Sequence, residues 1–237
     1  AIVDFTTSNG GVDSVTTYAW EILAGSDDIG LDSSISGDIS QQVTNETTDT
    51  LTATVEVTPT YTNDEVSCTG PSKEFTITVN PTAQVNDPAD QIICNTETTS
   101  VEFTTENTGG TTTYAWTNDT TSIGLGALGT GDIPSFSGVT NVTSPVTATI
   151  TVSPTFTENG VSCTGPSETF TITVNPTGQV YSIQDQILCN TNATTAIAFT
   201  TDNTGGTTTY SWTNDTDSIG LSATGSGDIA SFNAVNK

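Results

Sequence analysis

The four cysteines are the most chemically reactive side chains of this sequence, and they recur at a fixed spacing. Cys68 and Cys163 lie 95 residues apart, and so do Cys94 and Cys189. The sequence has no histidine and no CxxC pair, so the pattern is not that of a zinc site. Disulfide bonds are the better interpretation, and they suit an oxidising compartment outside the cytoplasm.

Two disulfide pairings respect the spacing. Cys94 would join Cys163 within one repeat, which leaves Cys68 and Cys189 to partners outside the sequence. Alternatively, Cys68 would join Cys94 and Cys163 would join Cys189 across the repeat boundaries. We favour the first pairing, because a domain that folds alone gains most from an internal bridge. On the chain-entropy model, closing that loop would stabilise the domain by about 4 kcal/mol.

The charge of the chain excludes several classes of partner. It carries 27 acidic residues against two basic ones, Lys73 and Lys237, for a net charge of −25. Nucleic acids and anionic membrane surfaces attract clusters of Lys and Arg, which this chain lacks. No stretch approaches eighteen apolar residues in length, so we expect no membrane insertion.

Clustered carboxylates make calcium the one metal worth considering. The segment GSDDIGLD carries Asp27, Asp28 and Asp32, and carboxylate oxygens are the ligands that Ca²⁺ prefers. The second repeat has Ser122 and Gly126 where the first has Asp28 and Asp32, so the motif is not part of the repeat. We therefore favour acidic turns, with no cofactor and Ca²⁺ only as a weak alternative.

The sequence predicts no catalytic site. Without histidine there is no general base of the most common kind and no Ser-His-Asp triad. The acidic residues that could form a glycosidase pair sit in turns or recur once per repeat. We expect a protein that is not an enzyme.

The elements that carry these residues form a tandem array. Trp20, Trp116 and Trp212 follow one another at intervals of 96 residues, within TTYAW, TTYAW and TTYSW. Units of this length suit independent β-sandwich domains better than solenoid repeats. We expect an excerpt of a longer chain in three parts: a first repeat truncated at its N-terminal end (1–80), a complete central repeat (81–175) and a third repeat truncated at its C-terminal end (176–237).

Period-two alternation predicts an all-β fold of tandem immunoglobulin-like sandwiches. In PVTATITV, Val146, Ala148 and Ile150 share one face while threonines occupy the other. Trp116 is expected to anchor the core of the central repeat. The linkers VNPTAQV and VNPTGQV have one proline each and little glycine, so they should be semi-rigid. In the central repeat the expected strands are 90–94, 99–105, 111–117, 132–138, 145–156 and 168–175.

Several motifs in fixed order resemble a known family. The run CTGPS-x-x-FTITVNPTAQV, then DQIICN, then FTTENTGGTTTYAWTNDTTSIGL is similar to the repeats of SprB-like mobile gliding-motility surface adhesins of Bacteroidota. Those repeats are similar to PKD-like (polycystic-kidney-disease-like), immunoglobulin-type modules. YAWTNDT stands where PKD modules usually carry a WxFGDG-like turn. The resemblance implies an extracellular filament attached to the outer membrane, exported by type IX secretion and moved by the gliding machinery.

The leading hypothesis is thus a non-enzymatic stalk of a cell-surface adhesin, whose expected partners are neighbouring repeats and a surface polysaccharide or the substratum. The alternative is a carbohydrate-binding or spacer array in a secreted, type IX-exported enzyme. The triplets DSV, DTL, DTT and DSI also resemble the O-glycosylation signal of Bacteroidota. They mark four candidate acceptors: Ser14, Thr50, Thr120 and Ser218.

Overall fold

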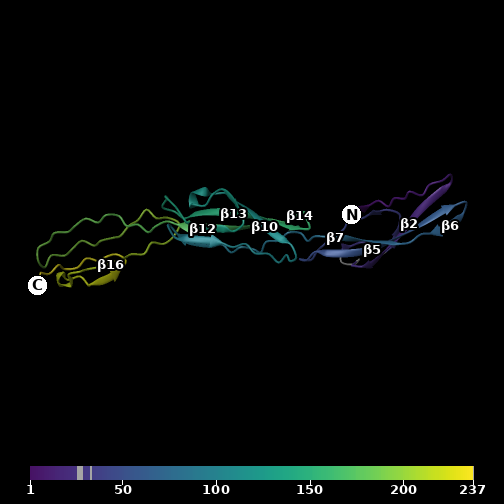
Figure 1. Cartoon of the computed structure of the whole chain (residues 1–237). Helices are drawn as coiled ribbons and strands as arrows, with labels where there is room; N and C mark the ends of the chain where they lie inside the picture. The colour runs from purple at the N-terminus through teal and green to yellow at the C-terminus, as the bar shows by residue number, and fades with distance from the viewer. Residues whose placement is uncertain (26–28, 33, 237) are drawn as a thin grey trace.

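The computed structural model describes residues 1–25, 29–32 and 34–236, and the protein is all-β. Its regular structure falls into three sets of strands that follow the repeats of the sequence. Figure 1 shows the three repeats arranged end to end, with the first at the right and the third at the left. The chain is therefore much longer than it is wide.

The central repeat is a β-sandwich. Its larger sheet has the order β11-β10-β13-β15-β8, with β14 also paired to β13, and a two-stranded sheet of β9 and β12 lies opposite. Most neighbours are antiparallel, but β8 and β15 run parallel. Its elements are β8 (Gln91–Cys94), β9 (Thr98–Val101), β10 (Thr111–Asn118), the 3-10 helix η1 (Thr121–Ile123), β11 (Leu128–Thr130), β12 (Ile133–Ser137), β13 (Val146–Glu158), β14 (Val161–Thr164) and β15 (Glu168–Asn175).

The first repeat has the same plan with fewer strands. Its larger sheet has the order β3-β2-β5-β6, with β7 paired to β5, and β1 pairs with β4. The sequence has no counterpart of β8 in this repeat, because Val3 corresponds to Val101 of β9. The strands are β1 (Ile2–Val3), β2 (Ser14–Ala24), β3 (Ser34–Ser36), β4 (Ile39–Ser40), β5 (Leu51–Asn63), β6 (Val66–Thr69) and β7 (Lys73–Val79).

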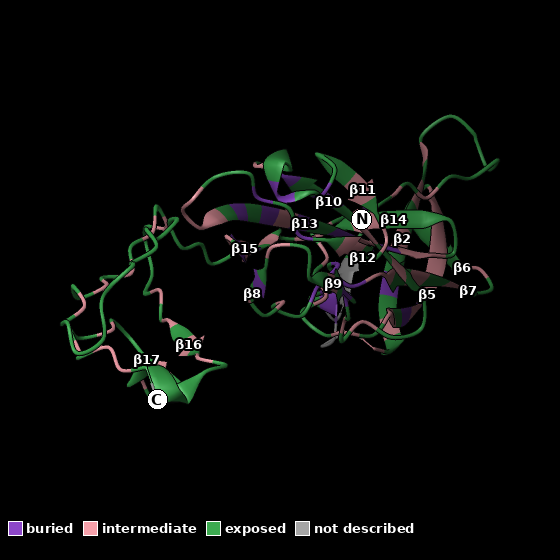
Figure 2. Cartoon of the chain, turned by 90° about the vertical axis from the view of Figure 1, so that its left-hand side faces the viewer, coloured by how far each residue is buried: buried purple, intermediate pink, exposed green. Residues whose placement is uncertain are grey.

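The third repeat is open. It contains β16 (Ser211–Thr213), the 3-10 helix η2 (Asp217–Ile219), β17 (Thr224–Ser226) and two isolated bridges. The sequence has no counterpart here of residues 142–175, which supply β13, β14 and β15 to the central repeat. None of its residues in the described range 176–236 is fully buried, as the colours around β16 and β17 in Figure 2 show. A sandwich face without its partner strands cannot exclude water.

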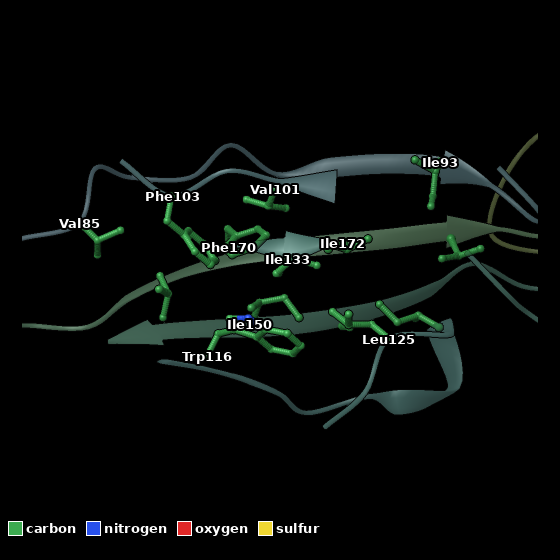
Figure 3. Close-up of a cluster of buried hydrophobic side chains, with 14 residues drawn as sticks. Val85, Ile93, Val101, Phe103, Trp116, Leu125, Ile133, Ile150, Phe170 and Ile172 are labelled. Atoms are coloured by element: carbon green, nitrogen blue, oxygen red, sulfur yellow. The ribbon is translucent and has the colours of Figure 1, made fainter. Parts of the chain in front are cut away.

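The core of the central repeat confirms the predicted faces. Ala148, Ile150 and Val152 of β13 are inaccessible to solvent, while the threonines between them are more exposed. Trp116 is 5% exposed and packs in the same cluster (Figure 3). The ring centroids of Phe103 and Phe170 lie 6.2 Å apart, edge to face. β-Branched and aromatic side chains on alternate positions thus meet between the two sheets, as the periodicity indicates.

The six expected strands of the central repeat are confirmed with three differences, of which the first is the additional strand β11 (Leu128–Thr130). β9 ends at Val101 rather than at residue 105, because the backbone N–H of Phe103 donates to the carboxylate of Asp132 (2.9 Å) instead of joining the ladder. β14 was not expected at all. None of its four residues, VSCT, is fully buried. They form a strand because they pair with the end of β13.

Candidate functional site at the junctions between repeats

The geometry that recurs within this chain lies where one repeat meets the next. We call residues 80–85 the first linker and residues 175–180 the second linker. The first linker leaves β7 and packs onto the central repeat, where Pro81 and Ala83 are completely buried. The proline ring fixes the φ angle of Pro81, and the burial of Pro81 and Ala83 restricts the other backbone angles of the linker.

Asn107 holds the first linker through both ends of its amide. Its Oδ1 accepts a hydrogen bond from the backbone N–H of Gln84 (2.7 Å), and its Nδ2 donates to the carbonyl of Thr82 (3.1 Å). The side chain is positioned by Thr105, whose hydroxyl accepts from the N–H of Asn107 (3.1 Å). Such short-range side-chain to backbone bonds are how Thr and Asn shape a turn. We call this arrangement the asparagine clamp.

The second junction repeats the asparagine clamp bond for bond. Asn203 Oδ1 accepts from the N–H of Gln179 (2.8 Å), and its Nδ2 donates to the carbonyl of Thr177 (3.1 Å). The Thr201 hydroxyl accepts from the N–H of Asn203 (3.1 Å), as the Thr105 hydroxyl does from that of Asn107. Each linker is therefore held by the following repeat in the same way at both junctions.

The loops of adjacent repeats are also bonded directly. The backbone N–H of Thr108 donates to the carbonyl of Thr48 (3.1 Å) at the first junction. The N–H of Thr204 donates to the carbonyl of Thr143 (2.9 Å) at the second. These bonds lie beside the clamp, so each junction is held at more than one point.

Asn80 ties the end of the first repeat to the β13–β14 hairpin of the central one. Its Nδ2 donates to the carbonyls of Glu158 (3.0 Å) and Val161 (3.2 Å). The Thr50 hydroxyl donates to the Glu158 carboxylate across the same junction. The Glu158 carboxylate is thus bonded across the junction by a neutral hydroxyl and not by a basic side chain.

A glycine makes room for the first linker. A Cβ built on Gly165 would lie 1.7 Å from the carbonyl oxygen of Ala83, closer than any real contact. Gly165 lies within CTGPS, the motif that recurs with Gly70 in the first repeat. The glycine of this motif allows the linker backbone to pack closely against the central repeat. The sequence alone did not predict this contact.

The predicted Cys94–Cys163 disulfide is wrong. All four cysteines lie in the described part of the chain, and none is in a disulfide. Cys94 is in register with Asn175, whose neighbour Val174 pairs with Val146 at the start of β13. Cys163 pairs with Phe156 near the other end of β13. Ten residues of strand separate these ends by about 33 Å, whereas a disulfide needs Cα atoms within about 7 Å.

The alternative pairing across the boundaries fails for a related reason. Cys68 pairs with Tyr61 near the end of β5 that lies away from the first junction. Cys94 lies at the far end of the central repeat, beside the second junction. At least one repeat length separates the two, and the same holds for Cys163 and Cys189.

The structure brings no metal site together from the candidates that it describes. Asp27 and Asp28 lie outside the described residues. Asp32 is exposed, and its carboxylate accepts a hydrogen bond from the Gln41 amide (3.2 Å). In the described ranges, no three His, Cys, Asp or Glu side chains are grouped as metal ligands would be.

The candidate O-glycosylation acceptors differ in accessibility. Ser218 is exposed, in η2, and Thr120 is half-buried just before η1. Ser14 is half-buried and donates to the carbonyl of Gly11 (3.1 Å). Thr50 is engaged with Glu158 at the junction. A glycan on Thr50 would therefore compete with the contact between repeats, whereas Ser218 is free to carry one.

A cavity of about 520 Å³ in the third repeat lies where the central repeat has its core. Ile219, Leu221 and Ile229 line it, and they correspond by the 96-residue interval to three buried core residues of the central repeat. Asp185 is the one carboxylate in its lining. The arrangement offers an apolar surface for strands and no pair of carboxylates.

Comparison with known proteins gives a limited result. No protein-family model matches the chain, and no curated protein matches its sequence. Among solved structures, it is similar to "Zebrafish RET Cadherin Like Domains 1 to 4" at 12% identity and a TM-score of 0.26. The match covers 92% of this chain and 58% of the zebrafish chain. No helix in the described ranges is long and apolar enough to cross a membrane.

Proposed function

We propose that this chain is part of the stalk of an extracellular adhesin and has no enzymatic activity of its own. The observation that carries the proposal is the repeated junction, in which Asn107 and Asn203 make the same bonds to successive linkers. Linkers that are held by the same bonds in successive repeats convert a string of domains into an extended, semi-rigid rod. Such a rod places a distant binding tip away from the cell.

The dimensions and charge of the repeats suit this role. β13 has 13 residues, and at about 3.3 Å each it spans roughly 43 Å. A few repeats in series therefore reach well over 100 Å. The net charge of −25 makes neighbouring filaments repel one another at distances within the Debye length. Long, separated filaments are what a surface adhesin requires.

The motif resemblance described above supplies the biological setting of the proposal. It places the filament on the outer membrane of a gliding bacterium of the Bacteroidota, with export by type IX secretion and movement by the gliding machinery. Neighbouring repeats are then the immediate partners of each unit. A polysaccharide or the substratum is the partner of the whole filament.

The aromatic side chains favour a stalk over a carbohydrate-binding array. Sugar-binding sandwiches present exposed aromatic rings to their ligands, since rings stack on sugar faces. Of the described aromatic residues in this chain, Tyr181 alone is exposed, and it has no equivalent aromatic in the first linker region, where Asn86 follows Val85. A recurring sugar platform is thus absent from the described surface.

Two measurements on the same preparation test the proposal. Small-angle X-ray scattering should give the distance distribution of an elongated particle, with a maximum dimension that changes little between low and physiological salt. A glycan array should show no binding at micromolar concentration. A compact or highly flexible particle would contradict the stalk, and specific glycan binding would favour the carbohydrate-binding alternative.

A further inference from the structure

We propose that a disulfide cross-links the junction between two complete successive repeats of this type. It joins the cysteine at the end of β8 in one repeat to the cysteine of β14 in the next repeat. Within residues 1–237, the first junction contains Cys163 alone and the second contains Cys94 alone. The proposal follows from the geometry of the junctions and does not depend on the adhesin function.

The first step is the place of Cys94. It lies in register with Asn175 in the parallel pair of β8 and β15, so both side chains project from the same face of the sheet. Ile93 and Val174, the residues before them, are buried, which turns Cys94 and Asn175 outward. The cysteine is exposed, directly beside the residue that begins the second linker.

The second step uses Asn80, which is the counterpart of Asn175 in the first repeat. The side chain of Asn80 donates to the carbonyls of Glu158 and Val161 in the β13–β14 hairpin. Cys163 is two residues along β14 from Val161, and it therefore projects from the same side of the strand. A cysteine placed beside Asn80, as Cys94 is placed beside Asn175, would lie next to Cys163.

The surroundings of the β14 cysteine support the same pairing without reference to the register of β8 and β15. In the first repeat, which has no preceding linker in the sequence, a cavity of about 390 Å³ lies at Cys68 and Gly70. In the central repeat, Ala83 of the linker lies against Gly165, the equivalent of Gly70, and Asn80 donates to the carbonyl of Val161, two residues before Cys163. Cys68 is exposed, whereas Cys163 is partly covered. The β14 cysteine therefore lies close to the linker that comes from the preceding repeat.

The chemistry is ordinary thiol–disulfide exchange with a low-molecular-weight disulfide as oxidant. One cysteine thiolate attacks the oxidant and displaces a thiolate, and the second cysteine then attacks the mixed disulfide and displaces the other. The two cysteine thiols lose two protons and two electrons and form one S–S bond. The oxidant is reduced to two thiols.

The test adds the proposed partner cysteine to the full chain. A copy of residues 86–98 is fused in front of Ala1, because Val3 corresponds to Val101 and Ala1 therefore corresponds to Thr99. The chain is oxidised with glutathione disulfide, and its disulfides are mapped by non-reducing peptide mass spectrometry. We expect the added cysteine to be linked to Cys163, while Cys68, Cys94 and Cys189 keep their reactivity toward an alkylating reagent.

Two variants of the extended chain serve as controls. C163S should abolish the link, and C68S should leave it unchanged, because these cysteines occupy equivalent places in different repeats. A link from the added cysteine to Cys68 or Cys94, or an added cysteine and Cys163 that both stay reduced in the folded chain, would overturn the proposal. Near-ultraviolet circular dichroism verifies that the extended chain is folded.

A second extension tests the other junction independently. A copy of residues 142–175 follows Lys237, which corresponds to Asn141, and it supplies the third repeat with a β14 cysteine. We expect this cysteine to be linked to Cys94 after the same oxidation. If both added cysteines remain reduced in folded chains, the disulfide is refuted, while the elongated shape measured by scattering would still support the stalk.

Discussion

The carbonyl oxygen of Ala83 lies against the α-carbon of Gly165, in the space that a side chain would occupy. The two residues belong to different structural units, since Ala83 is in the linker and Gly165 follows β14 of the central repeat. This contact joins the NPTAQV motif of the first linker to the CTGPS motif of the following repeat.

Replacing Gly165 by alanine should release the first linker. The Cβ would lie 1.7 Å from the oxygen and 2.6 Å from the carbonyl carbon of Ala83, so the backbone of one partner must move. Overpacking of this kind costs about 1–3 kcal/mol. We expect cleavage by proteinase K within residues 80–85 to rise, and the scattering profile to indicate a more flexible particle.

Gly70 provides the matched control for this substitution. It is the equivalent glycine of the first repeat, and a Cβ there would meet only Pro59, at 3.1 Å from its Cγ. The G70A variant should therefore keep the wild-type cleavage pattern in the linker. Equal effects of G165A and G70A would show that the contact with Ala83 does not hold the junction.

Removal of the Asn107 side chain should loosen the same linker by a different route. The N107A variant leaves the N–H of Gln84 and the carbonyl of Thr82 without their partner, at a cost of about 1–2 kcal/mol. Hydrogen exchange at the Gln84 amide should become roughly tenfold faster. Substitution of Asn141, an exposed asparagine of the same repeat, should leave that rate unchanged. An unaltered Gln84 rate in N107A would contradict the clamp.

The absence of a side chain at Gly129 should stabilise the core of the central repeat. It lies opposite Trp116 in the pairing of β10 and β11, and a Cβ on it would lie 2.2 Å from Cζ2 of the indole. We expect G129A to lower the free energy of unfolding by about 1–3 kcal/mol. Urea unfolding followed by Trp116 fluorescence, with Trp20 and Trp212 replaced by Phe, measures the change.

The control for G129A is G126A in the same background. Gly126 has no close neighbour, with its nearest contact 4.0 Å away, and its φ is not positive. Its replacement should leave the urea midpoint unchanged or slightly raised. Similar destabilisation by both variants would mean that the effect is not contact with the indole.

Asp119 should make a small, pH-dependent contribution to stability. The backbone N–H of Thr149 donates to its carboxylate (2.8 Å), and this bond, followed by the Thr120 hydroxyl, holds the pKa of Asp119 below its ordinary value of 3.8. A lowered pKa gives stability that is present above the ordinary value and is lost as the pH falls through the folded value. An NMR titration of the carboxyl carbon should show the low pKa, and D119N should lack this pH dependence. A titration midpoint at or above 3.8 would contradict the bond.

The faces of β13 and the burial of Trp116 could be predicted from the sequence because each depends on a short, local pattern. The asparagine clamp could not, since its partners lie in another segment and nothing in the immediate sequence of Asn107 shows what it binds. The signal that was available is the recurrence of Asn107 and Asn203 at the 96-residue interval, within TENTGG and TDNTGG. The disulfide prediction failed because the spacing of cysteines does not say at which end of a sandwich each one lies.

The parallel pairing of β8 with β15 determines how a repeat responds to mechanical tension. The chain enters the repeat through β8 and leaves it through β15, and four residues of each strand are in register. A pull on the two ends of the array draws these strands in opposite directions along their length. Their hydrogen bonds are then loaded together in shear, rather than one after another as in peeling, so a stretched array resists unfolding at the place where the load is transmitted.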